Sequence, residues 1–200
     1  MKRTAPVAHP VHEIIAERHS PRCFDGRSIN PETLASLFEA ARWAPSSFNE
    51  QPWRFIIARR EDKADHDRLF DLLTPGNQTW AQTAAVLTVS VAKTDFTRTG
   101  KPNRHAFHDV GIASGLLAAQ ATAYGIGVHM MAGFDRERAK TELAIPDGFE
   151  AVAAMALGYP EEPGNMPDAE RERLEAPRTR KPLSDMLFLG QFGQPVKGIT

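Results

Sequence analysis

The stretch DVGIASGLLAAQATAY, residues 109–124, is the part of the sequence that decides the fold most directly. Asp109 is expected to cap a helix that runs from Val110 to Tyr124. Apolar or small residues fill nearly every position of this helix, and a helix of that composition is buried on most of its sides. Its glycines and alanines would also let another helix approach closely. The stretch therefore predicts a central, packed helix.

Other helices and strands intermix on both sides of this helix, which indicates an α/β or α+β protein. Apolar spacing predicts further helices at residues 10–19, 31–43, 62–73 and 135–143, with a short one from about Thr79. Strands are predicted at residues 54–58, 86–92, 128–131 and 152–157. Pro75-Gly76-Asn77 is expected to form a turn, and residues 93–104 an irregular excursion. We expect residues 1–200 to form one domain, with residues 160–200 as its extended arm.

Composition narrows the class of protein. The 200 residues suit one ordinary domain, and the formal charge of −1 argues against a dedicated nucleic-acid binder. A single cysteine, Cys23, excludes an intramolecular disulfide and a multi-cysteine metal site, and it fits the reducing cytoplasm. No signal peptide or apolar run of about 20 residues is apparent. We therefore expect a cytoplasmic protein with neither a membrane nor a nucleic acid as partner.

Two arginine pairs suggest an anion site. Arg18 and Arg22 flank Ser20, and planar guanidinium groups beside a hydroxyl suit a phosphate. Arg178 and Arg180 would point the same way on an extended chain and could reach the same anion. The alternative for the first pair is that the stem of Arg18 packs on apolar surface and a solvent-exposed loop follows it. The alternative for the second pair is a solvent-exposed run of charged residues.

Two connections are suited to contact a planar ligand. Residues 44–53 (APSSFNEQPW) are dense in side-chain donors and acceptors just before a strand, and Asn77 lies in another turn. Residues 130–135 (MMAGFD) join a strand to a helix, where Gly133 would let backbone N–H groups approach a ligand. Ordinary helix-stop, turn and strand–helix connections are the alternatives.

Other chemistries have weaker support. The seven histidines form no HExxH motif and no metal-ligand spacing, so we expect no metal. No GxSxG motif is present, although Ser46 or Ser47 with a histidine leaves a hydrolase open. Cys23 next to Arg22 is either a thiol of lowered pKa or a buried structural thiol.

Taken together and in order, these segments resemble the nitroreductase family of FMN-dependent oxidoreductases. The matching pieces are residues 18–24, 41–53, 77–80, 109–113, 125–127, 133–135, 157–160 and 178–180. The resemblance implies an α+β fold with a central, mostly antiparallel sheet flanked by helices. It also implies an intertwined homodimer that exchanges its C-terminal arms and holds two FMN molecules at the subunit interface.

The resemblance assigns site residues by matching position. The FMN-binding residues would be Arg18, His19, Ser20, Arg22, Pro45, Ser46, Ser47, Asn49, Gln51, Asn77, Ala132, Gly133, Arg178 and Arg180. Arg18, Ser20 and the two arm arginines would bind the phosphate, and Arg22 and Asn77 the polar edge of the flavin. Residues 45–49 would reach the FMN of the other subunit. Many relatives carry a polar or acidic residue in place of Ala132, so here only the backbone could act.

The implied reaction is a ping-pong transfer of electrons from NADH or NADPH through tightly bound FMN to nitro compounds, quinones or similar acceptors. The chemistry would take place on the flavin, with no protein nucleophile or obligatory base. Phe96 and Phe107 would contact the acceptor. Two alternatives remain: another flavin reaction on the same scaffold, such as a dehydrogenase or dehalogenase, and a non-enzymatic flavin-binding protein.

Overall fold

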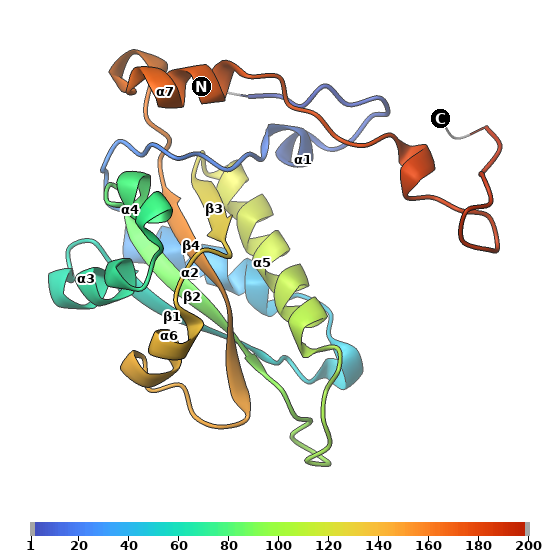
Figure 1. The fold of residues 1–200 in the computed structure, drawn as a ribbon, viewed down its shortest axis with the longest axis horizontal. Coiled ribbons are helices and arrows are strands. Elements are labelled where there is room, and N and C mark those ends of the chain that lie inside the picture. Colours follow the sequence, from blue (N-terminus) through green and yellow to red (C-terminus); the bar gives the residue numbers. More distant parts are fainter. Residues whose placement is uncertain (1–2, 199–200) are drawn as a thin grey trace.

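A four-stranded antiparallel sheet forms the centre of the computed structural model, which describes residues 3–198 (Figure 1). The strands are β1 (Trp53–Arg59), β2 (Val86–Lys93), β3 (Gly127–Met131) and β4 (Phe149–Gly158), in the spatial order β1-β2-β4-β3. Every neighbouring pair is antiparallel. The predicted α+β class with a mostly antiparallel sheet is confirmed.

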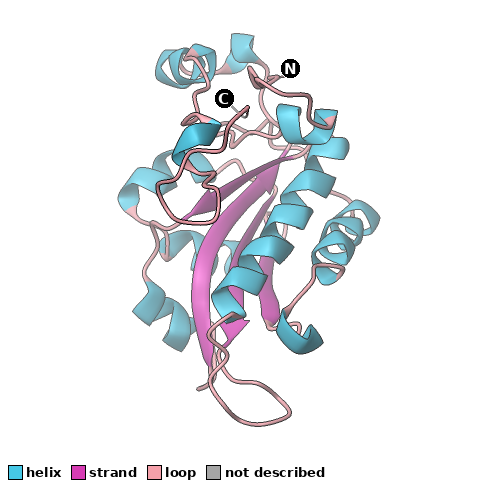
Figure 2. Ribbon diagram, turned by 90° about the vertical axis from the view of Figure 1, so that its right-hand side faces the viewer, coloured by secondary structure: helices cyan, strands magenta, loops and turns pink. Residues whose placement is uncertain are grey.

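Helices cover both faces of the sheet (Figure 2). One face packs against α2 (Pro31–Arg42) and α5 (Ala106–Ala123), and the other against α3 (Lys63–Asp71), α4 (Pro75–Ala81) and α6 (Arg136–Glu142). The helices within residues 3–198 are too short or too polar to span a bilayer.

The central strands carry apolar side chains on both faces, which explains their continuous apolar sequences. In β4, Met155 and Leu157 lie in the core beside α2 and α5, while Ala154 and Ala156 lie in the opposite core. This alternation follows from the two-residue period of a strand. At the bulge after Ser90, the serine hydroxyl donates to the carbonyl of Ala153 (3.1 Å), so a polar group is satisfied inside the sheet.

Helix α5 differs from its prediction in two ways. It begins at Ala106, so Asp109 lies inside its first turn and does not cap it. Its buried residues also follow only one side of the helix, whereas Gly111, Gly115 and Leu116 are exposed. A Cβ added at either glycine would have no neighbour within 4 Å. The predicted burial on most sides is therefore not reached within one chain.

The structure corrects the predicted helix at residues 10–19 and the predicted turn at residues 75–77. The first helix is short, α1 (Glu13–Glu17), because the ring of His12 caps its start and Arg18 leaves helical geometry at φ −56°, ψ 125°. The predicted turn at residues 75–77 is the first turn of α4. Pro75 occupies the first helical position, where proline needs no N–H partner, and Asn77 N–H donates to the carbonyl of Thr74 (2.8 Å).

The C-terminal arm runs across one end of the domain and then projects away from it (Figure 1). It is extended for most of its length, but it also contains α7 (Asp168–Glu175) and short 3-10 turns at Pro163–Asn165 and Leu183–Asp185. The sequence gives no apolar period for α7. Its charged side chains instead pair one turn apart, as Arg173 does with Glu170 at 2.9 Å.

Candidate functional site

Four arginines gather beside α1. Arg18 follows α1 directly, and Arg3, Arg178 and Arg180 lie close enough to repel one another; we call these four residues the arginine cluster. Burial lowers the pKa of Arg18, and the positive charge of Arg180 lowers that pKa further. Across residues 3–198, no carboxylate forms an ion pair with Arg18, Arg178 or Arg180. Partly buried cations without a counterion form a ready site for an anion.

Arg178 supports this cluster through backbone contacts. Its guanidinium donates to the carbonyls of Ala16 (2.9 Å), Arg18 (2.7 Å) and Arg3 (2.5 Å). The bonds to Ala16 and Arg18 satisfy carbonyls at the C-terminal end of α1, which the helix itself leaves unpaired, and the bond to Arg3 reaches the N-terminal segment. Arg178 thereby joins the arm to α1 and fixes the backbone that carries Arg18.

Arg180 lies in a different setting from Arg178. It is exposed, and its hydrogen bond goes only to the carbonyl of the neighbouring Thr179. Together with Arg18 it lines a groove of about 650 Å³, whose remaining walls include the apolar side chains of Val11, Ile15 and Leu183. Such a groove offers both charge and apolar surface to a ligand.

The segment after Arg18 is held by α4 and β3. Arg18 donates to the hydroxyl of Ser20 at a long 3.4 Å, and Nδ1 of His129 donates to the carbonyl of Pro21 at 2.9 Å. The His129 ring lies 4.5 Å from that of Trp80, and the Arg22 guanidinium lies 5.8 Å from the same indole. Burial lowers the pKa of His129, so the ring is neutral near pH 7.

His19 lies in the same segment. Its Nδ1 donates to the carbonyl of Glu17 at 3.1 Å. Burial is the main cause that lowers its pKa, and the positive charges of Arg178, Arg3 and Arg18 act in the same direction. The ring therefore adds no positive charge to the arginine cluster near neutral pH.

Asn77 and the 132–133 turn, far apart in sequence, lie side by side. Nδ2 of Asn77 and the backbone N–H of Thr74 both donate to the carbonyl of Gly133, at 2.9 and 3.0 Å. A Cβ at position 133 would lie 2.7 Å from Asn77 Nδ2 and 2.8 Å from Thr74 Oγ1. Any larger residue at position 133 would displace these side chains or the turn, and Ala132 next to it is exposed.

The 46–51 loop has a strained backbone. Phe48, Asn49 and Gln51 have φ of 52°, 55° and 52°, in the left-handed region that side chains disfavour. Ser46 Oγ accepts from the Gln51 N–H (3.0 Å), and the buried carboxylate of Asp109 accepts from the Ser47 N–H (3.0 Å), while the preceding Pro45 is exposed. Strain of this kind persists where surrounding contacts enforce it, often at functional sites.

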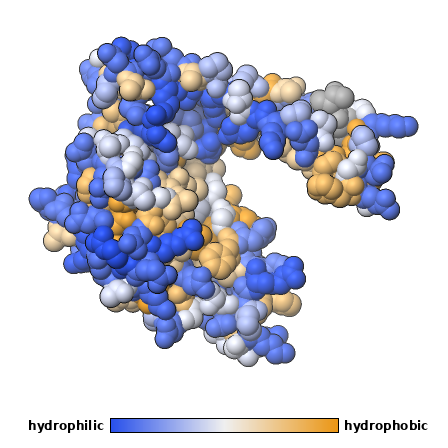
Figure 3. All heavy atoms as spheres, viewed as in Figure 1, coloured by the Kyte–Doolittle hydropathy of each residue, from blue (hydrophilic) through white to orange (hydrophobic). Residues whose placement is uncertain are grey.

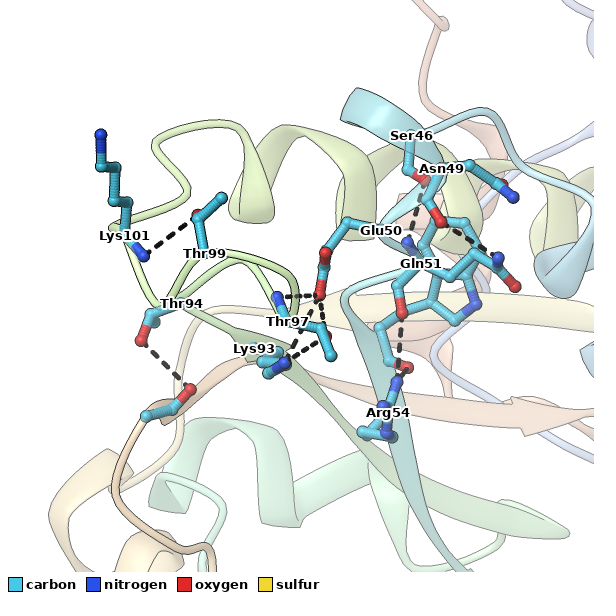
Figure 4. A network of polar contacts seen from close by, with 12 residues as sticks. Ser46, Asn49, Glu50, Gln51, Arg54, Lys93, Thr94, Thr97, Thr99 and Lys101 are labelled. Carbon is cyan, nitrogen blue, oxygen red and sulfur yellow. Dashed lines mark hydrogen bonds and ion pairs between the residues drawn. The ribbon is translucent and has the colours of Figure 1, made fainter.

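Two acids organise this loop in a way that the sequence did not predict. Asp109 was expected to cap a helix, but a buried acid in an apolar helix could have signalled a distant partner. Glu50 contacts Lys93 and Thr97 (Figure 4). Phe48 is almost fully exposed and meets the edge of Phe96 with ring centres 5.8 Å apart; Phe107 is half exposed near the start of α5.

The predicted site residues form two groups at opposite ends of α5. Ser47 is bonded to Asp109 near the helix start, whereas the cavity beside His19 is lined by Thr122 and Ala123 at its end. Fourteen residues of α-helix span about 21 Å. One chain therefore does not bring the 46–51 loop to the arginine cluster.

Cys23 is half-buried in a small cavity beside Arg22. Burial and the charges of Glu161 and Glu170 raise the pKa of its thiol. The alternative of a lowered pKa is therefore wrong, because the nearby acids and burial outweigh the adjacent arginine.

The family model described as the nitroreductase family matches residues 15–159 of this chain. The chain belongs to the nitroreductase family. The match runs from α1 to the end of β4, so the recognised fold includes the 18–22 segment and the 46–51 loop, and the arm lies outside it.

One solved structure and two individual proteins are also similar to this chain over most of its length. A solved structure described as an oxidoreductase containing FMN is 37% identical, with a TM-score of 0.88, and the alignment covers 97% of this chain and 100% of that one. An uncharacterised 15.4 kDa protein of Mycolicibacterium smegmatis is 34% identical over 72% of this chain and 99% of its own length. A Thermus thermophilus protein named NADH dehydrogenase is 29% identical over 82% of this chain and 93% of its own length.

Proposed function

We propose that this nitroreductase-family protein is an FMN-dependent oxidoreductase that passes electrons from NADH or NADPH to nitro compounds, quinones or similar acceptors. The observation that carries the proposal is that Arg18, Arg178 and Arg180 gather without a paired carboxylate among residues 3–198. The contact of Asn77 with Gly133 supports it as a second feature. The similar solved protein that contains FMN supports the same cofactor.

The residues present suit the parts of FMN. Arg18, Arg180 and Ser20 would hold the phosphate, because charge-assisted hydrogen bonds from guanidinium groups are strong and directional. Arg178 would act mainly through the backbone of Arg18, since its donors already reach three carbonyls. Arg22 would place a positive charge near the flavin ring, and Asn77 would offer its amide to the ring's polar edge.

FMN, when bound, supplies hydride acceptance and electron donation. The chain would contribute position and charge. The narrow turn at Gly133 would let backbone approach the ring, and His19 and His129, neutral near pH 7, would leave the arginines as the local charges. We infer a ping-pong order, in which the nicotinamide leaves before the acceptor enters the same pocket. Phe96 and Phe107 would contact that acceptor.

A second copy of the chain would complete each site. The exposed Gly111 and Gly115 leave α5 with a smooth face, which suits close packing of another helix. A partner's 46–51 loop, with the Pro45 that precedes it, could then supply Pro45, Ser46, Ser47, Asn49 and Gln51. The projecting arm ends in exposed Met186, Leu187, Leu189 and Phe192 (Figure 3), and burial of these side chains on the partner would remove them from water.

The test of the cofactor is the visible spectrum of the purified protein before and after NADPH or NADH is added under nitrogen. We expect a yellow protein whose flavin absorbance disappears with at least one nicotinamide and returns when a quinone is added. A colourless protein that takes up no FMN on reconstitution would overturn the proposal. A yellow protein that neither nicotinamide reduces would leave only the flavin-binding alternative.

The test of the shared site is Gly115→Glu. Within one chain a side chain at this position has free space, so the variant should fold with unchanged circular dichroism. At a dimer interface it would bury a charge, so we expect sedimentation as a monomer and loss of FMN. The matched control is Ala64→Glu on an exposed position of α3. A dimeric Gly115→Glu protein with full FMN content would contradict the shared site.

A further inference from the structure

Glu50 has an unusual setting for a loop glutamate. Its side chain is only 8% exposed, although it lies between Asn49 and Gln51, both of which have left-handed backbones. Its Oε1 accepts hydrogen bonds from the backbone N–H of Thr97 (2.8 Å), from the Thr97 hydroxyl and from Lys93 Nζ (3.4 Å). The same lysine also donates to the Thr97 hydroxyl, which closes a three-residue network (Figure 4).

The partner of Glu50 is a self-contained hairpin. Residues 94–103, which we call the 94–103 hairpin, are closed by a 2.9 Å bond from Phe96 N–H to Lys101 O and a 2.6 Å bond from Asn103 N–H to Thr94 O. Thr94 anchors its base to the Gly148 carbonyl, beside β4. Toward the 46–51 loop, the hairpin's contacts are those of Thr97 with Glu50 and of Phe96 with Phe48.

The carboxylate is well suited to join these two segments. The hydrogen bonds from Thr97 and Lys93 lower the pKa of Glu50, so its charge persists across the neutral range. A buried carboxylate left without its donors would be strongly destabilised, which makes the contact largely all-or-none. The contact also joins positions 47 residues apart in the sequence.

We propose that Glu50 is a positioning residue that fastens the 94–103 hairpin to the 46–51 loop and thereby controls which acceptors the enzyme prefers. Only the part of this inference that concerns acceptor preference rests on the proposed function. With Glu50 in place, Phe96 and Phe48 form one fixed aromatic corner. Without it, the hairpin would keep its base, the Lys93–Thr97 hydrogen bond and the contact of Phe96 with Phe48, and Phe96 would be held less firmly.

The first measurement needs no activity. Hydrogen exchange of the Thr97 backbone amide should become at least about tenfold faster in Glu50→Ala, because the acceptor of that N–H is lost. Glu50→Gln keeps an oxygen at the same place and should restore most of the protection. The control Glu32→Gln, an exposed glutamate on α2, should change nothing at Thr97. Unchanged exchange in Glu50→Ala would overturn the proposal.

The second measurement tests specificity with 1,4-benzoquinone and menadione as acceptors. A flat aromatic contact contributes about 0.5–1.5 kcal/mol, so we expect kcat/KM for menadione relative to benzoquinone to fall about 2- to 12-fold in Glu50→Ala, mainly through KM. Thr97→Val, which keeps the fold and the backbone N–H but removes the hydroxyl donor, should shift the ratio in the same direction by less. It also serves if Glu50→Ala does not fold.

The two proposals fail separately. If the wild-type protein binds no flavin, the exchange experiment still decides whether Glu50 holds the hairpin, and the proposed function alone falls. If the enzyme is active and Thr97 exchanges faster in Glu50→Ala while the ratio of the two quinones stays constant, Glu50 does not set acceptor preference.

Discussion

The two ends of α5 hold their candidate site residues in opposite ways. The arginine cluster lies beside the C-terminal end of the helix. Within residues 3–198, no carboxylate forms an ion pair with Arg18, Arg178 or Arg180. Beside the helix start, the 46–51 loop carries strained backbone whose polar groups are bonded to Asp109, Ser46 and Thr97. The first end has unused binding capacity, and the second has a fixed shape.

This difference suggests a division of work. Unpaired charge provides affinity for an anion, whereas a rigid loop whose one charge, on Glu50, is paired with Lys93 provides a wall that a ligand must fit. Changes at the arginine end should therefore alter how tightly a ligand is held. Changes at the loop end should alter the loop's order and the preference among ligands.

The largest effect is expected from Gly133→Val in the turn after β3. Its Cβ would lie within 2.8 Å of Asn77 and Thr74 side-chain atoms, so either these side chains or the turn must shift. A displacement near 1 Å at a reacting centre can lower a rate about 100-fold. Stopped-flow bleaching of the flavin by NADPH measures this rate, and Gly164→Val, where a Cβ meets nothing within 4 Å, is the control. A wild-type rate in Gly133→Val would remove the turn from the site.

Arg18→Ala should have the next largest effect, on cofactor affinity. Loss of a charge-assisted hydrogen bond costs about 1.5–3 kcal/mol, which corresponds to roughly a 10- to 150-fold weaker Kd for FMN. Fluorescence titration of the apoprotein with FMN measures it. Arg104→Ala removes an exposed arginine near the start of α5 and should leave the Kd unchanged. Equal losses in both variants would mean that net charge, and not the cluster, governs binding.

Asp109→Ala tests the loop end. It leaves the Ser47 N–H without its acceptor, so we expect the free energy of unfolding to fall by about 1–3 kcal/mol. Urea unfolding of the apoprotein measures this change, with Asp185→Ala in the exposed arm as the control. The Kd for FMN should change less than in Arg18→Ala. A free energy of unfolding equal to that of the wild type would show that Asp109 does not hold the loop.

The smallest effect is a dependence of stability on pH. Burial lowers the pKa of His19, His66 and His129, so below their unfolded value of about 6.5 the unfolded chain binds more protons than the folded one. The free energy of unfolding should therefore fall as the pH drops from 7.5 to 5.5. Two of these histidines lie at the arginine end. His129→Gln should reduce the slope in urea unfolding, and an unchanged slope would contradict this origin.

Local sequence patterns predicted the sheet well. The sequences of 86–92 and 128–131 coincide closely with β2 and β3, because helices on both faces of the sheet require mostly apolar residues there. Thr88, Ser90 and His129 are the polar exceptions. The patterns failed where stability comes from charge or distance. Helix α7 has no apolar period, and the exposed face at Gly111 and Gly115 cannot be distinguished by composition from a buried one.

The site residues also differ in whether the sequence could predict them. Resemblance to the family proposed Asn77 and Gly133 as site residues, and the structure places them in contact. Asp109 and Glu50 escaped prediction because their partners, Ser47 and Thr97, lie 62 and 47 residues away. Arg178 was expected beside an anion, yet its three backbone bonds follow from the path of the arm, which no local pattern specifies.

The bonds from Arg178 to the end of α1 also set an order of events during synthesis. Arg178 follows Arg18 by 160 residues, so the ribosome must add the whole sheet before the guanidinium exists to bind these carbonyls. At 5–20 residues per second, this delay is roughly 8 to 30 s. The nascent chain can assemble its sheet during that time, but the backbone that carries Arg18 acquires its final support only as the last part of the chain is made.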